Sequence, residues 1–318
     1  MPEDPRRRRL IPALCVLGGL GAAGLLAPLL ANDKPLAVWS GGRLSFPAAA
    51  DLPLLGPILS RGGSPADLRG TAAGAALRAP IPYSYRGVHL DATLLPPSRR
   101  HLFGTDLLGR DLCARLIHGA AVSLLVGFGA TLVALGLGAL LGGAGALRGG
   151  LADVLLTRAI EVLTCFPPFI LALALVTIGG GAGLLPIVLA IGVARAAGAA
   201  RFVRGEVLRF KGGPLWSAGR AAGATLPRLA LTHLLPLVGE PLAVQATFGV
   251  AYAILLESGL SFLGVGVQPP TPSWGMILAE GRPTLQIAWW PIVFPVLALA
   301  LTLAVLGYVG ERLATARE

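Results

Sequence analysis

Three carboxylates fall inside or at the ends of long apolar stretches, where an acidic side chain needs a special reason. They are Glu161, Glu240 and Glu257. A charge at the centre of a bilayer costs about 3 kcal/mol or more, so such side chains are expected to face a transport pathway or a partner. A position at the lipid headgroup boundary is the alternative. Of the three, Glu257 is the best candidate to line or seal a pathway, while the headgroup boundary suits Glu161 and Glu240 better.

The sequence lacks the residue patterns of catalysis and metal binding. Its three cysteines lie far apart, without metal-ligand spacing, and its four histidines are equally scattered. The only lysines are Lys34 and Lys211, and neither follows a phosphate-binding glycine loop. No nucleophile and base stand together. We therefore expect no catalytic, cofactor-binding or metal-binding residues, and no ATP hydrolysis by this chain.

The composition is that of a membrane protein. Hydrophobic residues make up 54% of the chain and charged residues only 13%, against about 25% charged in soluble domains. The net charge of +10 does not indicate binding to nucleic acid. The arginines cluster at the ends of apolar stretches, and no basic stripe carries interleaved aromatics. We expect an all-α, polytopic membrane protein with about six transmembrane helices.

The apolar stretches divide the chain into three parts. Residues 1–31 form a basic N-terminus and a first transmembrane helix from Leu10 to about Ala31, for which a cleaved signal peptide is the alternative. Residues 32–115 are a long polar, Pro/Gly-rich region without a span. Residues 116–318 are expected to form a five-helix core, with spans at about 117–142, 157–178, 184–201, 237–260 and 289–310.

Charge distribution predicts the topology of these spans. Basic residues fall in the loops 143–156 and 202–236 or at their boundaries. This places both loops in the cytoplasm with the N- and C-termini, and residues 32–115 outside. Pro167-Pro168 is expected to kink the third span or delay its start. Gly138 and Gly142 form a small-xxx-small pair, which predicts close helix packing.

The loop 202–236 contains the pattern of two short helices joined by a glycine. Pro214 suits the start of the first helix and Gly223 its end. Thr225 can cap a second helix that has Pro227 in its first turn and runs to Leu235-Pro236. The loop resembles the cytoplasmic coupling loop of ABC-importer permeases, with Ser217-Ala218-Gly219 where Glu-Ala-Ala is usual. By this resemblance the residues that couple to an ATPase are Trp216, Ser217, Ala218, Gly219, Arg220, Gly223, Leu235 and Pro236.

Two further blocks resemble the dipeptide, oligopeptide and nickel permeases, in their second-permease branch. The first is HLFGTDLLGRDLCARLIHGAAVSLLVG, from His101, and the second is ESGLSFLGVGVQPPTPSWGMILAEGR, from Glu257. The first block holds an outer-mouth motif, which shapes the external opening, contacts a binding protein, or fixes how the long loop enters span two. Its residues are Gly104, Thr105, Asp106, Gly109, Arg110 and Asp111. The second block holds the candidate pathway or gate residues Glu257, Ser261, Phe262 and Trp274, of which the tryptophan also suits a membrane interface.

The resemblance implies one permease subunit of an ATP-driven importer in the bacterial cytoplasmic (inner) membrane. Implied partners are a homologous second permease subunit, two cytoplasmic ABC ATPase subunits or domains and an extracytoplasmic solute-binding protein. Implied substrates are di- or oligopeptides, with nickel or another small solute as the alternative. A channel or secondary transporter would need paired charges or broken helices at mid-membrane. A non-transporting scaffold would need no pathway acids.

Overall fold

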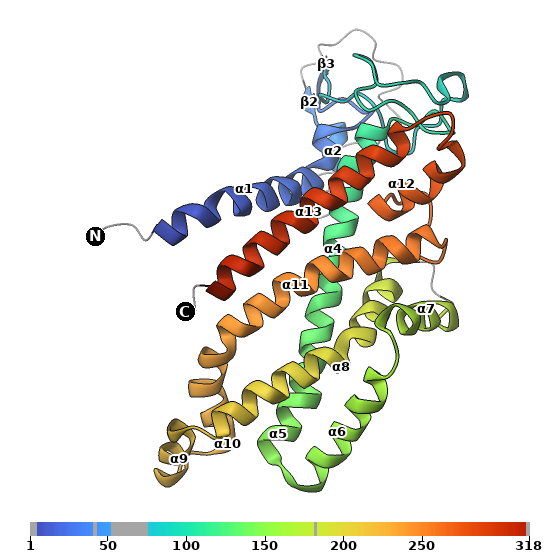
Figure 1. Ribbon diagram of the computed structural model, residues 1–318. Coiled ribbons are helices and arrows are strands. Elements are labelled where there is room, and N and C mark those ends of the chain that lie inside the picture. The colour runs from blue at the N-terminus through green and yellow to red at the C-terminus, as the bar shows by residue number, and fades with distance from the viewer. Residues whose placement is uncertain (1–4, 41–42, 52–75, 181–182, 316–318) are drawn as a thin grey trace. The chain divides into compact units, whose positions relative to one another are not determined.

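The structure is a computed structural model that describes residues 5–40, 43–51, 76–180 and 183–315. Helices dominate it, which confirms the all-α membrane fold class (Figure 1). The longer helices are α1 (Pro5–Leu25), α4 (Leu112–Gly138), α6 (Gly150–Thr164), α7 (Pro168–Ile178), α8 (Leu184–Lys211), α11 (Leu235–Phe262) and α13 (Trp290–Thr315). The shorter ones are α2 (Ala27–Leu30), α5 (Ala144–Arg148), α9 (Pro214–Ala221), α10 (Leu226–Leu229) and α12 (Trp274–Gly281).

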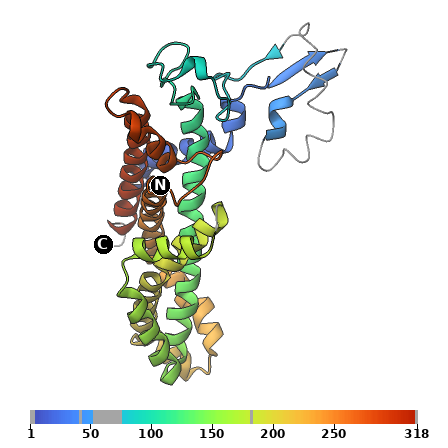
Figure 2. The same ribbon diagram turned by 90° about the vertical axis from the view of Figure 1, so that its right-hand side faces the viewer.

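Irregular helical turns and one small sheet complete the described elements. Two π-helical segments, η5 (Ala139–Gly143) and η6 (Ala230–Leu234), lie within long helices. The 3-10 turns are η1 (Pro47–Asp51), η4 (Leu90–Ala92) and η7 (Arg282–Thr284). The strands β1 (Ala37–Ser40), β2 (Arg43–Ser45) and β3 (Ala76–Leu77) form an antiparallel sheet in the order β2-β1-β3, within the predicted polar region (Figure 2).

The chain forms two compact units. The helical unit contains Met1–Leu14, Leu125–Leu260 and Thr302–Glu318, and the loop-bearing unit contains Cys15–Leu124 and Ser261–Leu301. This division follows contacts between residues. The three-part division at residues 31 and 115 follows membrane topology instead, and it stays a prediction.

Among the described residues, four helical segments are long and apolar enough to cross a membrane. They are Leu112–Arg148, Leu184–Lys211, Leu226–Phe262 and Trp290–Thr315. The pair α6 and α7 would make a fifth if it counts as one span. The first predicted span is helical as α1, of which Cys15–Leu25 forms a shorter apolar segment. The structure therefore supports four of the six predicted spans, and the first and third remain predictions.

The predicted third span is not one straight helix. It breaks between Thr164 and Pro168, and α6 and α7 meet at an angle of 91°. Pro167 and Pro168 cause the break, because neither can donate a backbone hydrogen bond and each restricts the residue before it. The predicted kink is confirmed, and the continuous span over 157–178 is corrected to two helices.

Close packing through small residues joins α4 and η5 to α8 in the helical unit. A Cβ added at Gly138 would lie 2.8 Å from the carbonyl carbon of Ala199. A Cβ added at Gly142 would run into the carbonyl oxygen of Ala200. Both glycines are therefore needed for the approach of the two helices, as their spacing predicts.

Candidate functional site

The predicted coupling loop, residues 202–236 and called the coupling loop below, has a glycine turn after its first short helix, as predicted. After α9, Gly223 adopts a φ of +76°. Its N–H donates to the carbonyl of Arg220 at 3.0 Å, and the N–H of Ala224 donates to the carbonyl of Gly219 at 3.0 Å. This pair of bonds is the Schellman arrangement, which satisfies the last carbonyls of a helix and favours glycine at the left-handed position.

The second helix of the loop differs from the prediction in two ways. Thr225 occupies the position before α10 with an extended backbone, but its side chain makes no capping hydrogen bond. The helix also does not end at Leu235-Pro236: α10, η6 and α11 form one segment, Leu226–Phe262. The wide π turn η6 ends at Leu234, directly before the Leu235-Pro236 pair. Because Pro236 has no N–H to donate, the helix passes it by this local change of winding.

The small residue Gly219 has a packing role in this loop. A Cβ at this position would lie 2.5 Å from a methyl carbon of Leu229, which is fully buried at the end of α10. Glycine stands here in place of the second alanine of Glu-Ala-Ala, and its lack of a side chain leaves room for Leu229 to pack against α9. In contrast, Ser217, Ala218, Arg220, Leu235 and Pro236 are exposed.

The base of the coupling loop is tied to the rest of the helical unit. The rings of Trp216 and Phe210 meet edge-on, with their centres 5.8 Å apart. Lys211 Nζ lies 5.6 Å from the centre of the Trp216 ring. The same ammonium donates to the carbonyl of Ala146 at 2.7 Å. Nearby, Arg204 clamps Asp153 with two bonds of 3.0 and 2.9 Å. Movement of α9 would therefore be passed to α5, α6 and α8.

The outer-mouth motif forms a buried polar cluster in the loop-bearing unit. Asp106 accepts from Arg110 Nε at 2.7 Å and from Arg115 Nη1 at 2.6 Å. Its other oxygen accepts from the backbone N–H groups of Leu108 and Arg110 at 2.9 and 3.0 Å. Both arginines also pair with Glu280 of α12. We call these four side chains, Asp106, Arg110, Arg115 and Glu280, the four-charge cluster.

The remaining residues of the motif fix the start of α4. Asp111 accepts from the N–H of Ala114 at 2.8 Å, and His101 Nδ1 lies 2.9 Å from its second oxygen. Gly104 and Gly109 have φ values of +77° and +68°. Thr105 is fully buried. Its hydroxyl donates to the backbone carbonyl of Ala92 and accepts from the backbone N–H of Leu95, which both lie earlier in the chain. The motif therefore fastens the polar region to α4; a role in shaping an external mouth stays a prediction.

The four candidate gate residues occupy different settings. Glu257 is fully buried in the helical unit. In the loop-bearing unit, Ser261 accepts from the N–H of Val267 at 3.1 Å, and Phe262 lies under the guanidinium of Arg282 at 5.6 Å. Trp274 is only 1% exposed, and its indole N–H donates to the carbonyl of Leu116 at 3.1 Å. The tryptophan therefore anchors α12 to α4 and does not present its ring to a lipid interface.

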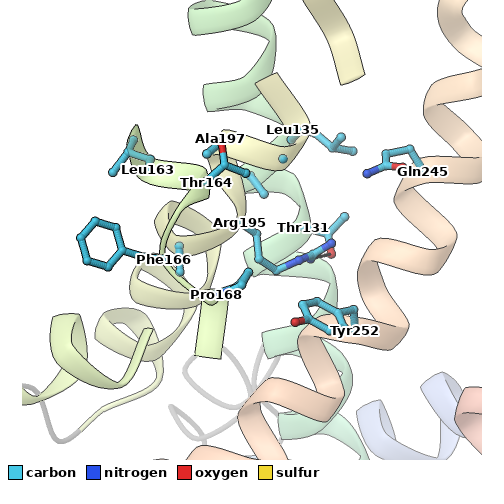
Figure 3. Close-up of a pocket in the computed structure, with 14 residues that line it drawn as sticks. Thr131, Leu135, Leu163, Thr164, Phe166, Pro168, Arg195, Ala197, Gln245 and Tyr252 are labelled. Atoms are coloured by element: carbon cyan, nitrogen blue, oxygen red, sulfur yellow. Dashed lines mark hydrogen bonds between the residues drawn. The ribbon is translucent and has the colours of Figure 1, made fainter. Parts of the chain in front are cut away.

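A cavity of about 300 Å³ opens in the helical unit, lined by α4, the α6–α7 break, α8 and α11 (Figure 3). Arg195 reaches into it from α8. Its Nη1 donates to the carbonyl of Gly249 at 2.8 Å and to Thr131 Oγ1 at 3.3 Å. Its guanidinium carbon lies 5.3 Å from the ring centre of Tyr252. The sequence motifs did not point to this arginine, although it lies within an apolar stretch, the same signal that singles out Glu257.

Within the described ranges, no three His, Cys, Asp or Glu side chains gather in a way that could hold a metal ion. The helical unit combines an exposed two-helix loop with a cavity that holds an arginine. The chain matches, over residues 134–317, the family described as "Binding-protein-dependent transport system inner membrane component". The chain belongs to this family. It is accordingly a membrane-embedded permease, not itself an enzyme.

Relatives of this permease carry more specific names. It is 39% identical over 243 residues to the di/tripeptide transport system permease protein DppC of Pseudomonas aeruginosa, covering 74% of this chain and 80% of the relative. The dipeptide permease protein DppC of Bacillus subtilis is 39% identical over 238 residues, 74% of each chain. The oligopeptide permease protein OppC of Haemophilus influenzae is 35% identical over 240 residues, 75% of this chain and 77% of the relative.

A solved structure is similar in fold. A chain of the MetNI methionine ABC transporter, in an inward facing conformation, aligns with a TM-score of 0.54 at 20% identity. The alignment covers 64% of this permease and 95% of that chain. At this identity the likeness concerns the fold alone.

Proposed function

We propose that this permease forms half of the translocation pathway of an ATP-driven importer for di- or oligopeptides. The observation that carries the proposal is its 35–39% identity, over about three quarters of its length, to permeases named for di/tripeptide, dipeptide and oligopeptide transport. These names favour peptides over nickel. A channel or secondary transporter is disfavoured because membership of the family implies a binding-protein-dependent system.

The proposed complex contains a homologous second permease subunit, two cytoplasmic ABC ATPase subunits and an extracytoplasmic binding protein. In this proposal the exposed residues of α9 and the Gly223 turn dock on an ATPase. Closure of the ATPase dimer would push the loop, and the ties through Lys211 and Arg204 would pass the push to α5, α6 and α8.

Reconstitution of the whole importer tests the proposed function. The permease is expected to copurify with two ATPase subunits and, in proteoliposomes with its binding protein, to take up trialanine only when ATP is present. The purified permease alone is expected not to hydrolyse ATP, because it lacks a phosphate-binding loop. Uptake of nickel without uptake of peptide, or sustained ATP hydrolysis by the isolated chain, would contradict the proposal.

We also propose that the coupling loop and both termini face the cytoplasm, with residues 32–115 outside. The basic residues of the loop 202–236 support this orientation through the positive-inside rule. A cysteine introduced at Trp216 is then expected to react with an impermeant maleimide only from the cytoplasmic side of membrane vesicles. A cysteine at exposed Leu90, in the external region, is the matched control with the opposite accessibility. Labelling of position 216 only from outside would overturn the topology.

A further inference from the structure

The charge of Arg195 has no carboxylate partner among the described residues. The cavity that it enters is lined by no aspartate or glutamate, and its other polar side chains are Thr131, Thr164, Gln245 and Tyr252. Both hydrogen bonds of Arg195 use one nitrogen, Nη1, and both acceptors are uncharged. No negative charge from the described side chains therefore balances the guanidinium.

An arginine without a carboxylate partner inside a transmembrane helix costs free energy unless another group binds it. Arg195 lies inside α8, and its contacts Thr131 and Gly249 lie inside α4 and α11, three helical segments long and apolar enough to span. Charges inside spans almost always face a cavity and mark the path of a substrate or ion. Arginine also presents a planar fork of N–H groups that matches a carboxylate.

The contacts of Arg195 leave two of its three guanidinium nitrogens without a hydrogen-bond partner among the described residues. Nη1 is held by α4 and α11, while no protein hydrogen bond uses Nε or Nη2 within the described chain. The guanidinium carbon also lies 5.3 Å from the centre of the Tyr252 ring, within the range of a cation–π interaction (Figure 3). A cavity of about 300 Å³ is at the small end of ligand-binding pockets, so it suits one end of a peptide and not a long chain.

We propose that Arg195 binds the C-terminal carboxylate of the peptide during its passage through the permease. This inference rests on the proposed function in peptide import. Thr131 and the Gly249 carbonyl position the guanidinium, and Nε and Nη2 donate to the carboxylate. The contact is a substrate contact within the membrane, separate from the first selection by the binding protein.

Paired uptake measurements in the reconstituted importer test the proposal, with trialanine and its C-terminal amide as probes. Arg195→Gln keeps a donor for the Gly249 carbonyl but removes the charge. It is expected to lower trialanine uptake about tenfold or more, because a charge-assisted hydrogen bond is lost, and to leave amide uptake and ATPase stimulation near wild type. The binding protein is the same in every arm, so its own preference cancels between variants.

Two further variants separate substrate binding from a structural role. Thr131→Val removes one hydrogen bond of Arg195 but keeps its charge, so the acid is still expected to be preferred over the amide. Arg195→Lys keeps the charge and the same preference. If Thr131→Val and Arg195→Gln lower trialanine uptake equally, Arg195 has only a structural role and the proposal is overturned. Loss of the preference in Arg195→Lys would overturn it too, even if Arg195→Gln failed to assemble.

The failure of this proposal is distinguishable from the failure of the proposed function. If Arg195→Gln transports trialanine at the wild-type rate, the carboxylate contact is refuted and peptide import stands. If the wild-type importer takes up no peptide, the proposed function is refuted, and the carboxylate contact with it.

Discussion

Replacing Gly223 with valine is expected to abolish transport while the protein stays in the membrane. At a φ of +76°, a side chain with a Cβ is strained by roughly 1–2 kcal/mol, and a β-branched one by more. No atom lies within 4 Å of the Cβ position, so the penalty comes from the backbone and not from a clash. That strain is small against the insertion of several spans, but it displaces the proposed docking surface, which would have to fit an ATPase. Uptake, ATPase stimulation by the binding protein and membrane abundance are the measurements.

Gly223→Asn is the matched control for this variant. Asparagine tolerates the left-handed region better than other residues with a side chain, so it is expected to keep most of the uptake. ATPase copurification should weaken in the valine variant alone. Normal uptake by Gly223→Val at wild-type abundance would refute the assignment of residues 202–236 as the coupling element.

The local geometry around Gly223 could be predicted because it depends on neighbours in sequence. Proline at a helix start and glycine at a helix end act through their own backbone preferences. The same holds for the break at Pro167-Pro168. Pro236 was misread for a related reason: proline ends a regular helix, but the π turn η6 before it lets the helix continue into α11.

The polar partners could not be predicted because they depend on the tertiary fold. Glu280 lies in a block whose resemblance was noted, yet nothing local links it to Arg110, 170 positions away. Arg195 falls within the predicted span 184–201, but no local pattern marks its partners. Its hydrogen-bond acceptors Thr131 and Gly249 lie 64 and 54 positions away in the chain. In both cases the partners come together only in the folded helices.

Replacing Asp106 with asparagine is expected to destabilise the loop-bearing unit by about 3–5 kcal/mol, the usual cost of breaking a buried ion pair. The Asp106 side chain is 6% exposed, and those of Arg110 and Arg115 are 10% and 2% exposed. In the wild type two acids balance two arginines in the four-charge cluster. The variant leaves both arginines to Glu280 alone. A large fall in membrane abundance and in the thermal unfolding midpoint of the detergent-solubilised protein should follow.

Asp51→Asn is the control for the loss of a carboxylate as such. Asp51 pairs with Lys34 at 2.7 Å, but both side chains are about 40% exposed, and exposed pairs contribute about 0–1 kcal/mol. Its unfolding midpoint should therefore stay near that of the wild type. Equal shifts in Asp51→Asn and Asp106→Asn would show that burial of the cluster adds nothing.

A double variant gives the decisive measurement for the four-charge cluster. Adding Arg115→Met to Asp106→Asn restores charge balance, with Arg110 and Glu280 still paired at 2.8 Å. Arg115 also has a buried Nε without a hydrogen-bond partner among the described residues, so removing it relieves an existing cost. The double variant is therefore expected to lose less stability than the two single variants added together. Strict additivity would mean that Asp106 and Arg115 act independently, and that the motif is held by its glycine turns and the Asp111 cap instead.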